Sequence, residues 1–316
     1  MAKWIVLVGF LCLTACSTGL VVPDGTSFED RYDTLARLDR ALIAVDVSER
    51  SRQLASEYRH LFGRSRDIQA RVPELTSQDL GWLLEAAYLV GMTTHHPEYW
   101  RIQEVAFLTL QERGTERPHH VADMFQALIL RRQFGQAQRL AARYPDLHLD
   151  QVPRVHRIAG HRRGLTVYRV ADDGALTEDR IPRPQGRHLV AVVHPLCAFS
   201  DRAMRYLAEH PSLLQHVPVT WITPVSGHLG MAAIGDWNRT HPHLQIVIPH
   251  AASDWPFVTG WHTPAFYLLD GQRLLGSVSG WPPEGNRKAL AALLAGNGAE
   301  DAADAAQEPQ IAGDPR

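Results

Sequence analysis

The chain contains little cysteine and almost no lysine. Its 316 residues include three cysteines, and Lys3 and Lys288 are the only lysines, so nearly all basic residues are arginine. We interpret this bias as a codon preference rather than as a sign of phosphate binding. Basic and acidic residues also balance, at 32 against 34, which leaves no strong global field to attract nucleic acid or an anionic surface.

Several common signatures of catalysis are missing as well. The sequence has no Gly-rich phosphate loop, no Gly-x-Ser-x-Gly elbow and no His-Glu-x-x-His helix. We assign it no cofactor, and a metal site is the least favoured of the functions considered below. The composition, 45% hydrophobic and 21% charged, excludes a wholly disordered, collagen-like or multi-span membrane protein. The length suggests two domains, each able to bury a core.

The amino-terminal segment reads as a targeting signal. Residues 1–16 are MAKWIVLVGFLCLTAC, a short basic start followed by an apolar run that is too short to span a bilayer as a mature helix. The run ends in Leu13-Thr14-Ala15-Cys16, which resembles the bacterial lipoprotein signal. The resemblance implies cleavage before Cys16, a diacylated thiol and an acylated new amino terminus, with palmitate-type chains as the membrane anchor.

The anchor also suggests a location. Several acyl chains on one residue give stable membrane attachment, because each buried methylene contributes about 0.8 kcal/mol. Among lipoproteins of Gram-negative bacteria, Asp after the lipidated Cys favours retention at the inner membrane, and this chain has Ser17 there. The resemblance therefore implies a protein tethered in the cell envelope, facing the periplasm, with the outer membrane favoured.

Cleavage and acylation leave one thiol in the mature protein. Cleavage removes Cys12 and acylation consumes Cys16, so only Cys197 stays free. The expected compartment is oxidising, and disulfides normally persist there. No intramolecular disulfide can form, and an unpaired Cys in an exported protein suggests a reactive thiol or intermolecular pairing.

The first half of the chain predicts helices. Ser27 with Asp30, and Thr76 with Asp79, resemble helix-capping pairs before apolar residues at helical spacing. Further helices are expected from Pro97 to Gly114 and over residues 121–132 and 136–142. The segment from Phe125 to Pro145 resembles a tetratricopeptide-type hairpin, although a compact helical domain without repeats fits equally well.

The second half predicts alternating strands and helices. Apolar runs at residues 188–193, 217–222 and 244–248 are separated by amphipathic segments at 201–214 and 231–237. Two later apolar runs, at 265–269 and 274–278, are joined by an Asp-Gly hairpin turn. This pattern predicts an α/β sheet with helices on both faces. The expected parts are a signal peptide (1–15), a tether (16–26), an α-helical domain (27–150), a linker with a leading strand (151–186), the α/β domain (187–297) and a disordered tail (298–316).

Two local motifs carry a resemblance to a known fold. A buried strand ends in His194-Pro195-Leu196-Cys197-Ala198-Phe199-Ser200 and enters a helix, and Trp261-His262-Thr263-Pro264 precedes a strand, a hairpin turn, a strand and a last helix. This order resembles the thioredoxin fold, closest to the periplasmic TlpA/ResA-like thiol–disulfide oxidoreductases. The resemblance implies that Cys197 is the nucleophilic thiol, that Pro264 is the cis proline of the fold, and that the backbone of Thr263 pairs with substrate.

The motif departs from the family at the second cysteine. Ser200 occupies the position of the resolving Cys, and it cannot release a mixed disulfide. Its hydroxyl could still donate a hydrogen bond to the sulfur of Cys197. A Cys at a helix N-terminus is expected to favour the thiolate, and a nearby protonated His194 would lower its pKa further.

Three functions remain open from the sequence. The first is thiol–disulfide exchange or mixed-disulfide capture of exported proteins by the single thiol Cys197, as a monothiol oxidoreductase or isomerase. The second is a non-catalytic scaffold whose helical and thioredoxin-like parts bind protein partners in the envelope. The third is a copper or zinc site, with ligands drawn from His194, Cys197, His228, His250 and His262.

Overall fold

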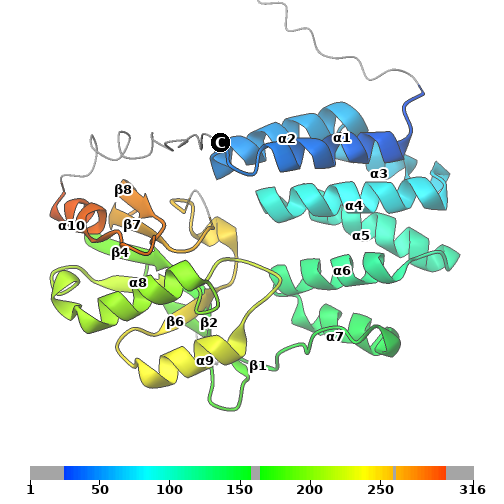
Figure 1. Cartoon of the computed structure of the whole chain (residues 1–316). Coiled ribbons are helices and arrows are strands. Elements are labelled where there is room, and N and C mark those ends of the chain that lie inside the picture. The colour runs from blue at the N-terminus through cyan, green and yellow to red at the C-terminus, as the bar shows by residue number, and fades with distance from the viewer. Residues whose placement is uncertain (1–24, 158–163, 259–260, 297–316) are drawn as a thin grey trace, which may run out of the picture.

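The computed structural model describes residues 25–157, 164–258 and 261–296. The predictions for the signal peptide, for the lipidation site Cys16 and for the tail 298–316 therefore lie outside the described residues. The described chain forms a helical amino-terminal unit and a carboxy-terminal unit built on a mixed sheet, and the two lie side by side (Figure 1). Among these residues, no helix has the length and apolar character needed to cross a bilayer.

The helical unit follows the capping signals of the sequence. The Ser27 hydroxyl accepts from the backbone N–H of Asp30 at 3.1 Å, and Thr76 does the same for Asp79. The helix predicted from Pro97 ends at Gly114, as expected. The elements are α1 Phe28–Ala41, α2 Val47–Phe62, α3 Ser65–Arg71, α4 Ser77–Thr94, α5 Pro97–Arg113, α6 Pro118–Leu130 and α7 Phe134–Arg143, with 3-10 turns at Val72–Glu74 and Pro145–Leu147.

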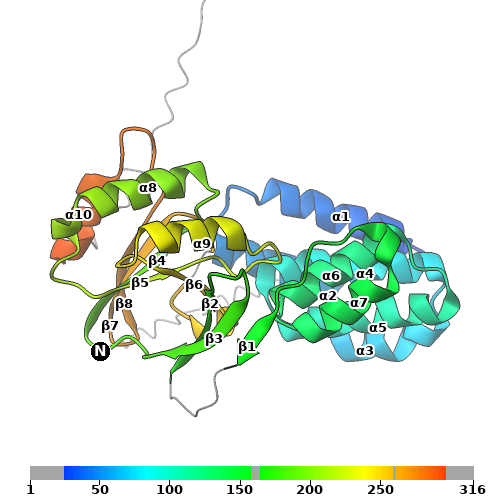
Figure 2. The ribbon, with the colours of Figure 1, turned by 90° about the horizontal axis from the view of Figure 1, so that it is seen from below.

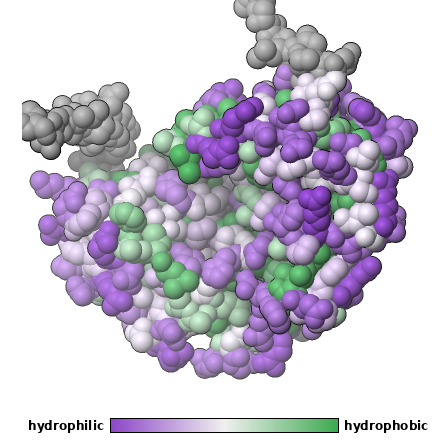
Figure 3. Space-filling view, turned by 45° about the vertical axis from the view of Figure 1, so that its right-hand side comes forward, coloured by the Kyte–Doolittle hydropathy of each residue, from purple (hydrophilic) through white to green (hydrophobic). Residues whose placement is uncertain are grey.

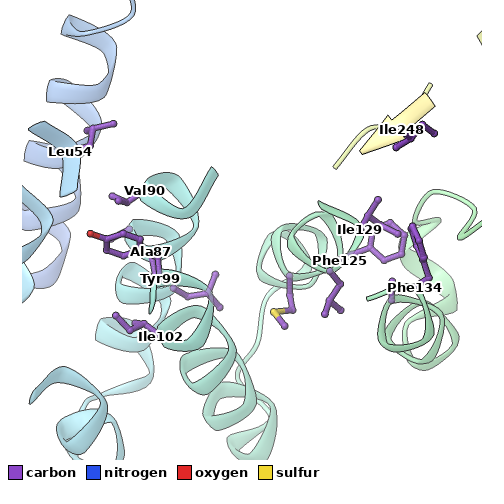
Figure 4. Packing of buried hydrophobic residues seen from close by; sticks show 14 of the residues in the cluster. Leu54, Ala87, Val90, Tyr99, Ile102, Phe125, Ile129, Phe134 and Ile248 are labelled. Carbon is purple, nitrogen blue, oxygen red and sulfur yellow. The ribbon is translucent and has the colours of Figure 1, made fainter. Parts of the chain in front are cut away.

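The helices of this unit pack as antiparallel neighbours around one core. At the α4–α5 crossing, Gly91 lies so close to the Trp100 ring that a Cβ there would stand 2.6 Å from it. Figure 4 shows Leu54 of α2, Val90 of α4 and Tyr99 of α5 within the same cluster of buried side chains. Burial of these apolar side chains stabilises the unit.

The second unit contains one continuous sheet of eight strands. Their order across the sheet is β1-β3-β2-β6-β5-β4-β7-β8, with β4, β5 and β6 parallel and β7 antiparallel to β4. The strands are β1 Val155–Arg157, β2 Leu165–Val170, β3 Leu176–Ile181, β4 Arg187–Val192, β5 Val219–Ile222, β6 Ile246–Pro249, β7 Ala265–Asp270 and β8 Arg273–Ser279.

The prediction of helices on both faces of the sheet was wrong. Helices α8 Ala198–Glu209, α9 Met231–Thr240 and α10 Arg287–Ala295 lie over the same face (Figure 2). Their buried residues share one cluster with Leu189 and Ala191 of β4. The chain moves in one direction from β4 to β5 to β6, and successive right-handed crossovers in one direction place their helices on one side.

A loop, rather than a helix, covers the opposite face. Trp255, Phe257 and Val258 pack there against Val190 and Val192 of β4. A 3-10 turn at Ala252–Asp254 begins this segment.

Two segments differ most from the sequence prediction. The segment 151–186, expected to be a linker with one leading strand, contributes the three strands β1, β2 and β3, and β2 pairs with β6. Helix α8 begins at Ala198 and ends at Glu209, earlier than the predicted 201–214. Pro211 has no N–H for a helical hydrogen bond and disfavours helical geometry in the residue before it, so α8 ends there.

The two units share a packed interface. Ile129 of α6 and Ile248 of β6 belong to one core cluster and lie near each other in Figure 4. Gly227 approaches α6 so closely that a Cβ would lie 2.5 Å from the Oε1 of Gln126. Arg132, in the turn between α6 and α7, donates from Nε to the Pro249 carbonyl oxygen and from Nη1 to that of Ser226.

Candidate functional site

The fold places Cys197 where a central strand gives way to a helix. Cys197 is the residue that caps the N-terminus of α8, and its backbone carbonyl accepts the first helical hydrogen bond, from Asp201 at 2.8 Å. The backbone of Cys197 is extended, with φ −90° and ψ 116°, as is typical of the residue that precedes a helix. Cys197 is the free cysteine among the described residues, and it is partly exposed.

The turn before β7 comes into contact with this thiol. The peptide bond between Thr263 and Pro264 is cis, as the sequence resemblance implies. The Cys197 Sγ lies 3.4 Å from the carbonyl oxygen of Thr263, within reach of an S–H···O hydrogen bond. The structure thus brings together Cys197, Thr263 and Pro264, which lie more than sixty residues apart in the chain.

Competing effects set the acidity of Cys197. Burial opposes ionisation of the thiol, but hydrogen bonds from the Thr263 side chain, from the backbone N–H groups of Ser200 and Phe199 and from the Ser200 hydroxyl outweigh it, so the Cys197 pKa lies below its usual value. The contact with the Thr263 carbonyl acts the other way, because a carbonyl can accept only from the neutral thiol. The donors at the helix N-terminus stabilise the thiolate.

Ser200 is fully buried one turn into α8. Its Oγ accepts a hydrogen bond from the backbone N–H of His194 at 3.1 Å. A hydroxyl can accept one bond and still donate another, so the Ser200 proton is free to point at the sulfur of Cys197. Ser200 therefore connects the end of β4 to the thiol.

The structure gives no support to the predicted role of His194 in lowering the Cys197 pKa. Its Nδ1 accepts from the backbone N–H of Leu196 at 3.2 Å, and its ring packs on Gly230, where a Cβ would lie 2.6 Å away. Burial lowers the pKa of His194, and the neighbouring His228 lowers it further. A neutral imidazole that is held in this way gives the Cys197 thiolate no positive charge.

The predicted copper or zinc ligands do not assemble at the thiol. Within the described residues, the sole group of three close ligand atoms belongs to the helical unit, at Glu85, His119 and His120. Of the other predicted ligands, His250 bonds to the Tyr168 hydroxyl through Nδ1 at 2.9 Å.

Two neighbouring histidines of the helical unit converge on one carboxylate. The Nε2 atoms of His119 and His120 lie 3.0 and 3.8 Å from one Glu85 carboxylate oxygen. The Nδ1 of His120 accepts from the backbone N–H of Arg117, so the proton of the neutral ring sits on Nε2 and faces Glu85. This cluster satisfies its own hydrogen bonds and leaves no free lone pair on His120.

Two exposed apolar side chains beside the thiol were missed. Leu196 is 64% exposed and Phe199 is 50% exposed, and they flank Cys197 on both sides. The Arg202 guanidinium lies over the Phe199 ring at 4.9 Å and holds it beside the site. Apolar residues adjacent to a cysteine are visible in the sequence, but their exposure follows only from the fold.

Comparison with known proteins adds no further constraint to this site. No protein-family model, no curated protein and no solved structure matches the chain.

Proposed function

We propose that the carboxy-terminal unit is a thioredoxin-type domain that performs thiol–disulfide exchange through the single thiol of Cys197. The observation that carries this proposal is the position of that thiol. It sits at the N-terminus of α8, in contact with Thr263 just before β7, with donors that lower its pKa. The order β4-α8-β5 followed by the β7–β8 hairpin and α10 supports the same proposal.

The chemistry is a balanced exchange at sulfur. The Cys197 thiolate attacks one sulfur of a client disulfide, forms a mixed disulfide with that half and expels the other half as a thiolate. Ser200 cannot resolve this bond, so an outside thiolate must attack it, which forms a new disulfide with the client and returns the Cys197 thiolate. The long-lived mixed disulfide makes capture of exported proteins the central event.

The remaining parts of the proposal concern location. The lipidated Cys16 would tether the chain in the cell envelope, facing the periplasm, with the outer membrane favoured. The helical unit would then hold protein partners close to the thiol. A Cys16→Ala variant should leave the membrane fraction, and its continued presence there would rule out this anchor.

Alkylation kinetics and client trapping test the proposal together. Full-length lipidated protein in detergent is treated with a charged alkylating reagent over a range of pH, with Cys197→Ala as the blank. We expect labelling to follow a pKa below that of a free thiol. Envelope extracts prepared without reductant should yield disulfide-linked partners with wild type and none with Cys197→Ala. Labelling only at alkaline pH would contradict the proposal.

A non-catalytic scaffold is the second candidate. The exposed Leu196 and Phe199 form an apolar surface that could bind a partner without any covalent step. A Cys197→Ser variant separates the two functions, because it retains this surface and loses the thiol. Full activity of Cys197→Ser in the cell would favour the scaffold.

A further inference from the structure

A cleft of about 810 Å³ lies between the two units, and one of its lining residues is the immediate neighbour of Cys197 in the chain. Leu196, the residue before Cys197, stands on its rim, and Phe125 and Ile129 of α6 contribute apolar surface on the far side. The side of α9 that faces the cleft carries small residues, including Ala232 and Gly235, which keep it open. Figure 3 shows a hollow between the units with hydrophobic side chains around it.

Acidic residues outnumber basic residues in the lining of the cleft. Four aspartates and two arginines line it, and both arginines are engaged: Arg154 pairs with Asp173 at 3.1 Å and Arg239 pairs with Asp236 at 3.0 Å. The two remaining carboxylates, of Asp150 and Asp172, are exposed and have no ion-pair partner among the described residues. An occupant of the cleft therefore meets uncompensated negative charge.

One wall of the cleft also offers main-chain hydrogen-bonding groups. Residues 150–153 run alongside it without regular secondary structure, up to strand β1. Among the described residues, the backbone groups of Gln151 and Val152 have no hydrogen-bond partner. A chain segment in extended conformation can pair with such groups, as peptides do at open strand edges.

We propose that this cleft binds an extended, basic segment of the client polypeptide and so selects which cysteine reaches Cys197. The proposal rests on the exchange function above and names its substrate class. The apolar side chain of Leu196 covers the residue next to the client cysteine. The backbone of Gln151 and Val152 pairs with the segment, and Asp150 and Asp172 attract its arginine or lysine side chains.

Matched peptides test the inference. Short cysteine peptides with arginine, neutral or glutamate flanks are activated as thiopyridyl disulfides, so the Cys197 thiolate forms a disulfide with the peptide and releases pyridinethione, which is measured by absorbance. With full-length lipidated protein in detergent, the arginine peptide should react about tenfold faster than the glutamate peptide at low salt, and salt should reduce the difference. The thiopyridyl disulfide of mercaptoethanol serves as the small neutral reagent.

Two double variants assign the effect to the cleft. Asp150→Asn/Asp172→Asn should remove most of the preference for the arginine peptide and leave the rate of the small reagent unchanged. Asp33→Asn/Glu112→Gln removes two exposed carboxylates from the helical unit outside the cleft and should keep the preference. Equal rates for the three peptides, beside a reactive small reagent, would overturn the cleft inference alone. An unreactive small reagent would overturn the proposed function and the inference with it.

Discussion

Ser200 joins the backbone at the end of β4 to the thiol of Cys197. Its Oγ accepts from the His194 N–H, and its hydroxyl favours the thiolate of Cys197. In Ser200→Ala this donor is lost, so the Cys197 pKa should rise, and alkylation at about pH 7 should slow by roughly fivefold as the thiolate fraction falls. Stability should also fall by about 1 kcal/mol, because the half-buried His194 N–H loses its acceptor.

A hydroxyl on another helix provides the control. Thr240 of α9 donates to the carbonyl oxygen of Asp236 at 3.0 Å, and no contact joins it to Cys197. Thr240→Ala should leave the pH profile of alkylation unchanged. If Ser200→Ala also left that profile unchanged, Ser200 would have no part in ionising the thiol.

Asp123 of α6 should make the stability of the helical unit depend on pH. Burial, aided by the Glu85 carboxylate and opposed by His119, raises the pKa of Asp123 to about 6. The folded state thus holds a proton that the unfolded chain, with a pKa of about 3.9 for Asp, has already released, and stability falls as pH rises from about 4 to about 6. Tyr32 and Tyr88 also lie near this carboxylate.

The variant Asp123→Asn removes that titration. After allowance for solvent screening, we expect it to stabilise the protein by about 1 kcal/mol at about pH 8 and to change little at about pH 4. Urea denaturation at the two pH values measures the difference, with Asp33→Asn on the exposed side of α1 as control. An equal effect of Asp123→Asn at both pH values would contradict a raised pKa.

Single residues of the site differ in how well the sequence predicts them. Cys197 could be singled out by elimination, since the other two cysteines lie in the predicted signal peptide and the predicted lipidation motif. The approach of Thr263 to the thiol followed from a resemblance in motif order. The position of the His194 ring could not be predicted from the sequence, because it depends on Gly230. This glycine is distant in sequence, and its lack of a side chain leaves room for the ring.

At the scale of the elements, replacing two helical glycines by alanine should change the stability of the protein in opposite directions. At Gly91 of α4, an added Cβ would meet the Trp100 ring of α5 at 2.6 Å, whereas at Gly135 of α7 the nearest atom is the Arg139 Nη1 at 3.8 Å. Gly91→Ala should therefore destabilise the protein by about 1–3 kcal/mol through overpacking. Gly135→Ala should stabilise it by about 0.5–1 kcal/mol through restriction of the unfolded chain.

Urea denaturation of both variants against wild type measures these changes. The pair controls for helix propensity, because each variant makes the same substitution inside a helix. Stabilisation by Gly91→Ala would show that α4 and α5 are not packed as closely as the structure places them.

Elements with strong local signals were predicted, and those that depend on distant partners were not. The helices that begin after Ser27 and Thr76 start where their capping side chains allow. Strand β3, with the sequence LTEDRI, alternates poorly and is mostly half-exposed. It forms because β2 pairs with one of its edges across a short turn and β1 pairs with the other, and the pairing with the more distant β1 leaves no local pattern in the sequence.

Arg132 links the two units of the molecule. The guanidinium is buried, which lowers its pKa to about 10 but leaves it charged near neutrality. It donates at 3.1 Å to the Pro249 carbonyl oxygen and at 3.0 Å to those of Ser226 and Ile129. Two of these acceptors belong to the sheet unit and one to the helical unit, so this side chain couples them.

Arg132→Met should weaken that coupling more than it weakens either unit. Two carbonyls of the sheet unit lose their donor, at an expected cost of about 1–3 kcal/mol, and the unfolding transition in urea should broaden or split as the units unfold separately. Arg131→Met is the matched control, since Arg131 pairs with Glu104 at 3.6 Å inside the helical unit. It should cost about 1 kcal/mol or less and keep a single transition. A sharp single transition in Arg132→Met, at the midpoint of wild type, would mean that the apolar contacts of Ile129 and Ile248 hold the units together without the guanidinium.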